Sequence, residues 1–161
     1  MAGASTLQRE IKQSRPFRSP GEEALIGLLR TTDMVRRRLS AIVEPHGITL
    51  QQYNVLRILR GAASAGLPTL EIAHRMVEQA PGITRLLDRL EAKALVRRER
   101  CPRDRRQVLC WITAPGSALL ADLDQPISRS DDSTLYMLSD IEKKRLIRLL
   151  DGIRAGLAGA E

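Results

Sequence analysis

The 161-residue sequence is poor in aromatic residues and cysteine, and it contains no long apolar run. Aromatic residues make up only 2% of the chain, so its core must be built from aliphatic side chains, which favours packed helices over a β-sandwich. No run of 18 apolar residues is present, which excludes a transmembrane helix, and we expect no membrane partner. The first 23 residues lack the apolar segment of a secretion signal, which predicts a cytoplasmic location.

Signatures of catalysis and of metal binding are also missing. The sequence contains no GxSxG, HExxH, P-loop or paired-carboxylate motif, so we do not expect an enzyme or a cofactor. The two cysteines lack a CxxC spacing, which argues against a disulfide framework. A zinc site would require His46, His74, Cys101 and Cys110 to converge from separate elements without ligand spacing, so no metal site is expected either.

Positive charge is what the chain has in excess. Its formal net charge is +7 and its isoelectric point is about 10.2. A basic balance of this size attracts polyanions, and the longest-range candidates are nucleic acids and anionic membrane surfaces.

Hydrophobic periodicity divides the chain into four parts. Residues 1–20 are polar and basic, with two prolines, and predict a flexible or extended arm. Residues 21–47 carry the apolar spacing of one long helix, ending at the sequence PHG. Residues 48–113 contain shorter elements. Residues 114–161 predict two further helices, the first ended or kinked near Pro126 and the second opened by a capping box at Ser139.

Within residues 48–113 the apolar period changes from helical spacing to alternation. Thr49 begins a capping box with Gln52, and Thr69 is expected to cap the next helix. The elements expected in this region are a helix at 50–60, a short helix at 70–76, a helix at 81–94, and two strands at 96–100 and 107–113 joined by the turn CPRDRR. The fold class predicted is therefore mainly α with a small β-hairpin.

Two helices followed at once by a basic hairpin are the layout of a winged helix-turn-helix. A helix fits the major groove of DNA, and arginines at the tip of a hairpin can reach the adjacent minor groove. The expected second helix and the hairpin hold eight of the 26 basic residues: Arg85, Arg89, Arg97, Arg98, Arg100, Arg103, Arg105 and Arg106. The sequence thus predicts binding to double-stranded DNA.

The segment ITRLLDRLEAKALVRRERCPRDRRQVLCWITAPG (83–116) resembles the recognition helix and wing of the multiple-antibiotic-resistance regulator (MarR) family. The matching features are the TRLLDRLE helix, the Ala-Leu-Val exit at 94–96, the DxR motif at 104–106 and the Ile-Thr-x-x-Gly strand end at 112–116. Residues 48–59, ITLQQYNVLRIL, are similar to the family's preceding helix. The resemblance extends over about residues 21–157.

This resemblance implies a homodimeric DNA-binding transcriptional regulator, most often a repressor. Its dimer region would combine the helix of 21–47 with the helices of 114–161, and residues 48–113 would bind a near-palindromic operator. It also implies release from DNA by a small aromatic or anionic effector that binds between the dimer helices and the DNA-binding part. Candidate effector-binding residues are Met34, Arg38, His46, Tyr53 and Arg57.

The DNA-binding residues expected from the same segment are Gln79, Pro81, Gly82, Thr84, Arg85, Arg89, Arg103, Asp104, Arg105 and Arg106. Arg105 and Arg106 are expected at the tip of the wing, with Asp104 orienting an arginine, since a carboxylate facing phosphate would be repelled. The chain departs from the family pattern at the start of the recognition helix, where it has Ala-Pro-Gly (80–82). It also has Ala94 where the family usually has glycine.

Three residues leave alternatives open. Cys101 lies among arginines and could make the protein a redox-responsive regulator, whereas Cys110 is expected in the core, out of register for a disulfide with Cys101. Trp111 shares a strand face with Leu109 and either packs against a neighbouring element or serves a ligand or partner surface. A further alternative is an interaction protein of the same fold that does not read DNA.

Overall fold

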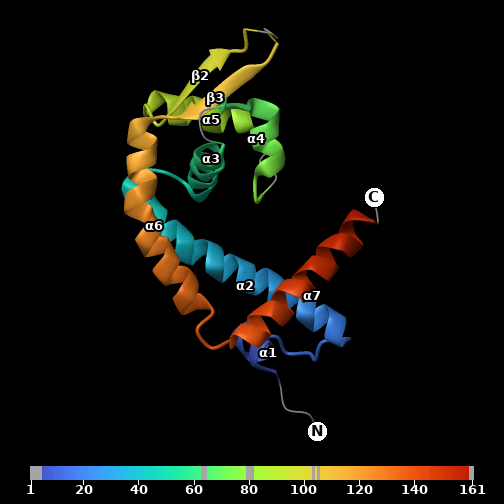
Figure 1. Cartoon of the computed structure of the whole chain (residues 1–161). Helices are drawn as coiled ribbons and strands as arrows, with labels where there is room; N and C mark the ends of the chain where they lie inside the picture. Colours follow the sequence, from blue (N-terminus) through green and yellow to red (C-terminus); the bar gives the residue numbers. More distant parts are fainter. Residues whose placement is uncertain (1–4, 63–64, 79–81, 103, 105, 160–161) are drawn as a thin grey trace.

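The computed structural model describes residues 5–62, 65–78, 82–102, 104 and 106–159, and it confirms a mainly helical chain with a small antiparallel sheet (Figure 1). Its elements are α1 (Thr6–Glu10), α2 (Pro20–Val43), the 3-10 helix η1 (Glu44–His46), α3 (Leu50–Gly61), β1 (Leu67–Pro68), α4 (Thr69–Arg75), α5 (Ile83–Ala92), β2 (Val96–Arg100), β3 (Val108–Ile112), α6 (Ala114–Thr134) and α7 (Asp140–Ala158). Among the described residues, no helix is both long enough and apolar enough to cross a membrane.

The helix starts follow the local chemistry of the sequence. Capping boxes open α3 at Thr49 and α7 at Ser139, as predicted, and the Ser19 hydroxyl accepts the Glu22 N–H at the start of α2. The predicted cap at Thr69 is wrong, because Thr69 is already the first residue of α4 and Pro68 occupies the cap position. The Thr69 hydroxyl instead donates to the Val108 carbonyl oxygen at 3.5 Å.

The hydrophobic core lies in the helix-turn-helix region and continues into α2 and α6. Its fully buried aliphatic side chains are Val43, Val55, Leu56, Leu59, Ile72, Leu87, Leu90, Val96, Leu120 and Leu123. The sheet has the order β1-β3-β2, and its first strand, only two residues long, was not expected from the sequence. In the hairpin, Val96 pairs with Ile112 and Arg98 with Cys110, which places buried Cys110 in the core as predicted.

Helix α6 continues past Pro126, the residue near which it was expected to end or kink. It passes through Pro126 to Thr134 because Leu123 and Ile127, on either side of the proline, are buried where α6 packs against α2 and α3. Proline removes one backbone hydrogen bond from the helix. Burial of the flanking apolar side chains stabilises the helix against that loss.

The N-terminal stretch contains more structure than the arm that the sequence predicts. Ser5 caps α1, accepting the Gln8 N–H at 3.2 Å. Leu7 on this helix faces Gly27 of α2, where a Cβ atom would lie 3.5 Å from the leucine Cδ2. A short helix can therefore dock on α2 because glycine leaves the surface flat at that point.

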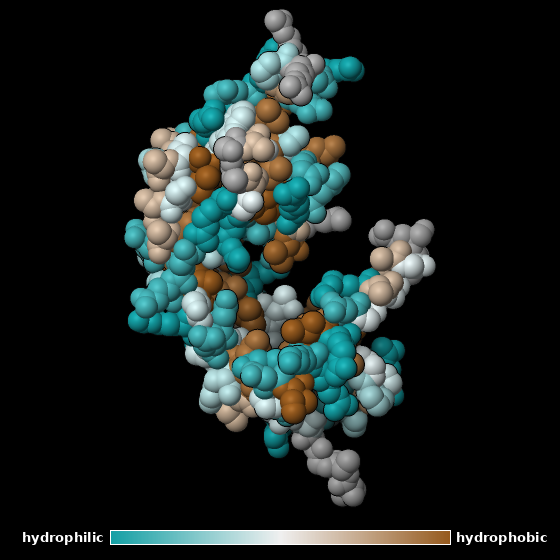
Figure 2. Space-filling view, in the orientation of Figure 1, coloured by the Kyte–Doolittle hydropathy of each residue, from teal (hydrophilic) through white to brown (hydrophobic). Residues whose placement is uncertain are grey.

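Helix α7 has no buried residue, although its sequence is amphipathic. In the view of Figure 1 it overlaps α2 in projection, and its C-terminal end projects away from the rest of the chain. Apolar residues border the hollow between α7 and the helix-turn-helix region (Figure 2). The exposed apolar side chains of α2, α7 and the segment before α7 are Leu25, Leu29, Met34, Leu135, Tyr136, Met137, Ile141, Ile147, Leu149, Ile153 and Leu157.

Candidate nucleic-acid interface

Helix α5 presents one buried and one polar face. It begins at Ile83, two residues later than the start predicted at Pro81, and Pro81 and Gln79 lie outside the described residues. Gly82 precedes it with φ 98°, a left-handed conformation that favours glycine and supplies no side-chain cap. Leu87 and Leu90 are buried, whereas the solvent face carries Thr84, Arg85, Asp88 and Arg89. The polar face thus contains the three α5 residues expected to contact DNA.

The hairpin of β2 and β3 forms the wing. Beyond the strands, the Cys101 N–H donates to the Gln107 carbonyl at 2.9 Å, and the Gln107 N–H donates to the Asp104 carbonyl at 2.9 Å. The Asp104 carboxylate accepts the Arg106 backbone N–H at 3.0 Å and lies 3.6 Å from the Arg106 Nε. Arg106 is 96% exposed, so Asp104 holds the base of a side chain whose end is in solvent. Arg103 and Arg105 lie outside the described residues.

A groove of about 680 Å³ separates the helices from the wing. Its walls combine α4, the start of α5 and both strands of the hairpin. The lining residues are Pro68, Thr69, Leu70, Glu71, His74, Ile83, Thr84, Arg98, Arg106, Gln107 and Val108. The structure therefore brings Thr84 and Arg106, two of the expected DNA contacts, to the same groove.

The other wing arginines are not equivalent to Arg106. Arg97 lies over the Trp111 ring, 4.2 Å from its centroid, and pairs with Glu99. Arg98 is turned to the opposite face of the hairpin, where its guanidinium contacts Asp88 and Glu91 of α5. Both cations thus have partners within the protein, although the sequence places them in the same arginine-rich stretch.

Positive charge is concentrated on the helix-turn-helix and wing. Residues 48–113 carry twelve arginines and lysines against six aspartates and glutamates, a net charge of +6 out of +7 for the whole chain. The remaining helices are close to neutral in total, so the field of the protein is strongest around α5 and the wing.

Trp111 packs against the loop that follows α3. A Cβ atom at Gly66 would lie 2.4 Å from the tryptophan Cε2, and Gly66 has φ 68°. The ring therefore occupies the space that only glycine leaves open, which supports the packing interpretation of Trp111. Its alternation with Cys110 is as predicted, since Trp111 pairs with Arg97 and Cys110 with Arg98.

The two cysteines are in different environments. Cys110 is fully buried, and burial raises the pKa of its thiol, which suits a core residue. Cys101 is half-buried at the start of the wing turn. Both thiols are free, and the register places Arg98 rather than Cys101 opposite Cys110.

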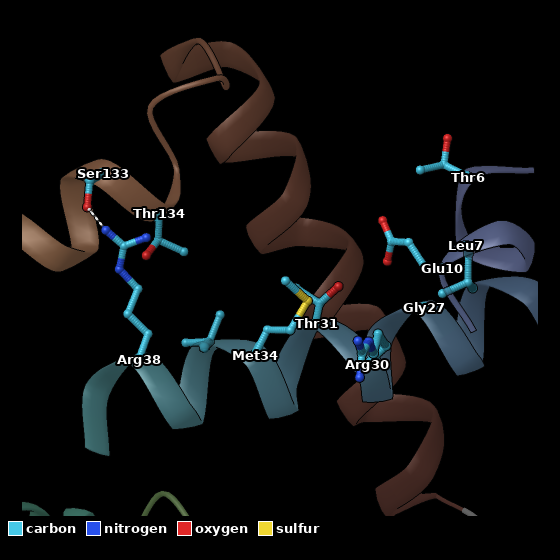
Figure 3. Close-up of a pocket in the computed structure, with 11 residues that line it drawn as sticks. Thr6, Leu7, Glu10, Gly27, Arg30, Thr31, Met34, Arg38, Ser133 and Thr134 are labelled. Atoms are coloured by element: carbon cyan, nitrogen blue, oxygen red, sulfur yellow. Dashed lines mark hydrogen bonds between the residues drawn. The ribbon is translucent and has the colours of Figure 1, made fainter. Parts of the chain in front are cut away.

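Four of the five effector candidates divide between two pockets. Met34 and Arg38 line a pocket of about 560 Å³ bounded by α1, α2 and the end of α6 (Figure 3). There, the Arg38 guanidinium donates to the Ser133 hydroxyl at 2.5 Å. Tyr53 and Arg57 line a second pocket of about 150 Å³. His46 is exposed in η1 and lines neither pocket.

The smaller pocket connects α2, α3 and the turn that precedes α5. Tyr53 forms its buried floor, burial raises the pKa of the phenol, and the Arg57 guanidinium carbon lies 5.9 Å from the ring centroid. The Val77 N–H donates to the Asn54 Oδ1 at 2.9 Å. Pocket residue Glu78 also pairs with Arg36 of α2 at 2.9 Å.

Sequence reasoning missed the ion pairs between separate elements, namely Arg36–Glu78, the contacts of Arg98 with α5, and Arg60–Asp124. The sequence does contain a signal for the contacts of Arg98 with α5. Thr84, Asp88 and Glu91 follow the i, i+4, i+7 spacing of one helix face, next to a strand rich in arginine. No comparable periodicity indicates Glu78, which lies in an irregular turn.

Known proteins show the same architecture. The sequence model of the MarR family matches residues 48–108. The transcriptional regulator HosA of Escherichia coli O111:H- is 33% identical over 104 residues, covering 64% of this chain and 75% of that protein. A MarR transcription factor from Planctomyces limnophilus is 40% identical with a TM-score of 0.66, covering 84% of this chain and 98% of that one. The S. aureus MepR–DNA complex shares the fold at 22% identity and a TM-score of 0.74, covering 80% and 95%. The chain belongs to the MarR family of winged-helix transcriptional regulators.

Proposed function

We propose that this protein is a homodimeric repressor that binds a near-palindromic double-stranded DNA operator and is released by a small aromatic or anionic effector. The main support for the DNA-binding part of this proposal is the groove shared by α5 and the wing. Thr84 from the helix and Arg106 from the hairpin line this groove, within the region that holds nearly all of the net positive charge. The MepR structure of the same fold, solved as a DNA complex, supports this proposal.

On this proposal, α5 enters the major groove and the wing reaches the neighbouring minor groove. Arg85 and Arg89 are exposed on the polar face of α5 and can contact phosphates or base edges. Arg106 is oriented by Asp104 and enters the minor groove, whose negative potential attracts guanidinium groups. Arg103, Arg105, Gln79, Pro81 and Gly82 are proposed as further contacts.

The unburied apolar face of α7 supports a dimer. A 19-residue amphipathic helix without a buried residue exposes apolar surface that a second copy can cover. Helix α2 also exposes Leu25 and Leu29. In a two-fold dimer, α2, α6 and α7 of both copies would form the core, and the two α5 helices would face successive turns of the operator.

The effector is proposed to bind in the pocket of Tyr53 and Arg57. An aromatic carboxylate would place its ring among the apolar side chains and its charge near the Arg57 guanidinium. The pocket ends at Met76, Val77 and Glu78, the turn that leads to α5. An occupant that moves this turn changes the position of the recognition helix, and binding then shifts the population toward a dimer unable to match its operator.

DNA binding is tested by an electrophoretic mobility shift with the DNA next to the protein's own gene. We expect a shifted band that weakens steeply with salt, and a reporter gene behind this DNA should be repressed. Arg106→Ala, alone or with Arg105→Ala, should weaken the complex while the protein still elutes as a dimer. Arg129→Ala, an exposed arginine of α6, is the matched control. Absence of any salt-sensitive shift would overturn the proposal.

Effector binding is tested by the melting temperature of the protein with a panel of substituted benzoates. A benzoate that binds should raise the melting temperature and release the DNA. The Arg57→Met variant should bind DNA normally but lose the response to the benzoate. A full response in this variant would refute the proposed site and leave the DNA-binding proposal intact.

A further inference from the structure

Arg98 occupies a central place between the recognition helix and the wing. Its Nη2 lies 2.7 Å from the Asp88 Oδ1 and 2.5 Å from the Glu91 Oε2, and its Nε donates to the same Glu91 oxygen at 2.9 Å. Only 21% of the side chain is exposed. One guanidinium on β2 thereby holds two carboxylates of α5.

These contacts leave Arg98 unsuited to a DNA phosphate. Two carboxylates surround one guanidinium, so the local charge of this cluster is negative. A phosphate would have to displace Glu91 or Asp88 from their hydrogen bonds with Arg98, and the remaining carboxylate would repel it. Arg106 differs in this respect, since it is almost fully exposed and faces a single carboxylate.

We propose that Arg98 is a positioning residue that fixes the wing relative to α5 and thereby sets the width of the groove between them. This inference rests on the proposed DNA-binding function, and it assigns to Arg98 a role in specificity instead of a contact with DNA. Arg98 pairs with Cys110 in the middle of the hairpin and also lines the groove beside Thr84.

The position of the Arg98 contacts along the hairpin explains why they fix the spacing between the wing and α5. Strand β2 begins at buried Val96, and the Arg98 contacts are the last side-chain links from this strand to α5 before the turn, among the described residues. Simultaneous contact of α5 and the wing with two grooves requires a defined spacing between them. A wing that pivots about Val96 would still attract phosphates by its charge. It would, however, adopt the spacing that the operator requires for a smaller fraction of the time.

The bidentate fork of arginine is essential to this role. Lysine keeps the charge but cannot reach two carboxylates with planar, parallel donors. We therefore expect Arg98→Lys and Arg98→Met both to weaken operator binding, each by about tenfold, as for the loss of one well-defined contact. Binding to a scrambled DNA of equal length should stay within about twofold, because non-specific affinity depends on phosphate contacts.

The salt dependence of operator binding distinguishes positioning from phosphate contact. A lost phosphate contact lowers the slope of log K against log salt by about 0.9. For Arg98→Met and Arg98→Lys we expect the slope of the wild type, whereas Arg106→Ala should lower it. If Arg98→Met lowers the slope by about one and Arg98→Lys restores it, Arg98 is a phosphate contact and the inference is wrong. Wild-type affinity in both Arg98 variants would also overturn it.

A second variant approaches the same contacts from the helix, in case Arg98→Met fails to fold. Asp88→Asn combined with Glu91→Gln removes two negative charges but leaves Arg98 in place. The positioning role predicts a smaller ratio of operator to scrambled-DNA affinity in this variant. An unchanged ratio with tighter binding to both DNAs would contradict it. Failure of the wild type to bind any DNA would instead refute the proposed function, so the two failures are distinguishable.

Discussion

Gly116 joins the wing to helix α6, and its replacement by alanine should be strongly destabilising. It is a buried residue in the first turn of α6, where its N–H donates to the Thr113 hydroxyl at 3.2 Å. A Cβ atom at this position would lie 2.3 Å from the Leu95 carbonyl oxygen and 2.8 Å from the Ile112 Cγ1. The oxygen cannot rotate away freely, because it accepts the Thr113 N–H at 3.1 Å.

The size of the effect follows from these contacts. Forcing an extra methyl group into a packed site costs about 1–3 kcal/mol, and weakening the Thr113–Leu95 hydrogen bond adds about 1 kcal/mol. Alanine restricts the unfolded chain more than glycine, which offsets about 0.5 kcal/mol. We expect the free energy of unfolding to fall by about 1.5–3.5 kcal/mol, a large part of a typical domain stability.

Urea unfolding measures this difference, at a fixed protein concentration because the apparent stability of the proposed dimer would depend on concentration. The midpoint for Gly116→Ala should fall by roughly 1 M. Gly61→Ala is the matched control, since no atom lies within 4 Å of a Cβ at Gly61 and the residue is in a helix. A midpoint for Gly116→Ala equal to that of the wild type would refute the packing argument.

Three further predictions concern other local contacts. Gly66→Ala should lower stability by about 2 kcal/mol and change the emission of Trp111, the only tryptophan, because the new methyl group displaces its ring. Ala94→Gly should raise stability by about 1 kcal/mol in thermal unfolding, since Ala94 has φ 56°, which glycine adopts without strain. Asp124→Asn should cost about 0.5 kcal/mol at neutral pH, because the exposed Asp124 accepts two hydrogen bonds from Arg60. These bonds lower the pKa of the Asp124 carboxyl. The stability difference between the wild type and Asp124→Asn, measured by urea unfolding, should therefore be complete above the ordinary aspartate pKa of about 4. It should vanish as the pH falls through the lowered pKa value.

Local sequence signals located most helix starts and the wing. Capping boxes depend on residues three positions apart, so the sequence alone contains all that is needed to predict the starts at Thr49 and Ser139. The change to a period of two likewise located β2 and β3. Ala94 in the left-handed exit of α5 shows why the family pattern favours glycine at this position.

Elements that depend on distant contacts could not be predicted in this way. Pro126 is a helix breaker by local rules, but the burial of Leu123 and Ile127 against two other helices keeps α6 intact. Strand β1 is two residues long and exists only because Leu67 pairs with Cys110, 43 positions later. Such pairings are tertiary, and no local pattern encodes them.

The arginines of the wing show how much of a binding surface can be predicted from the basic residues in a sequence. Along the chain, Arg97, Arg98 and Arg106 look alike. Alternation on β2 turns Arg97 toward Trp111 and Arg98 toward α5, so the fold gives each of them a partner within the protein. Arg106 lies beyond the strands, where no pairing rule determines its direction, and a single acidic residue orients it. A count of basic residues therefore predicts attraction to DNA. The strand register and the acidic residues of the neighbouring helix determine which cations are held within the protein and which remain exposed.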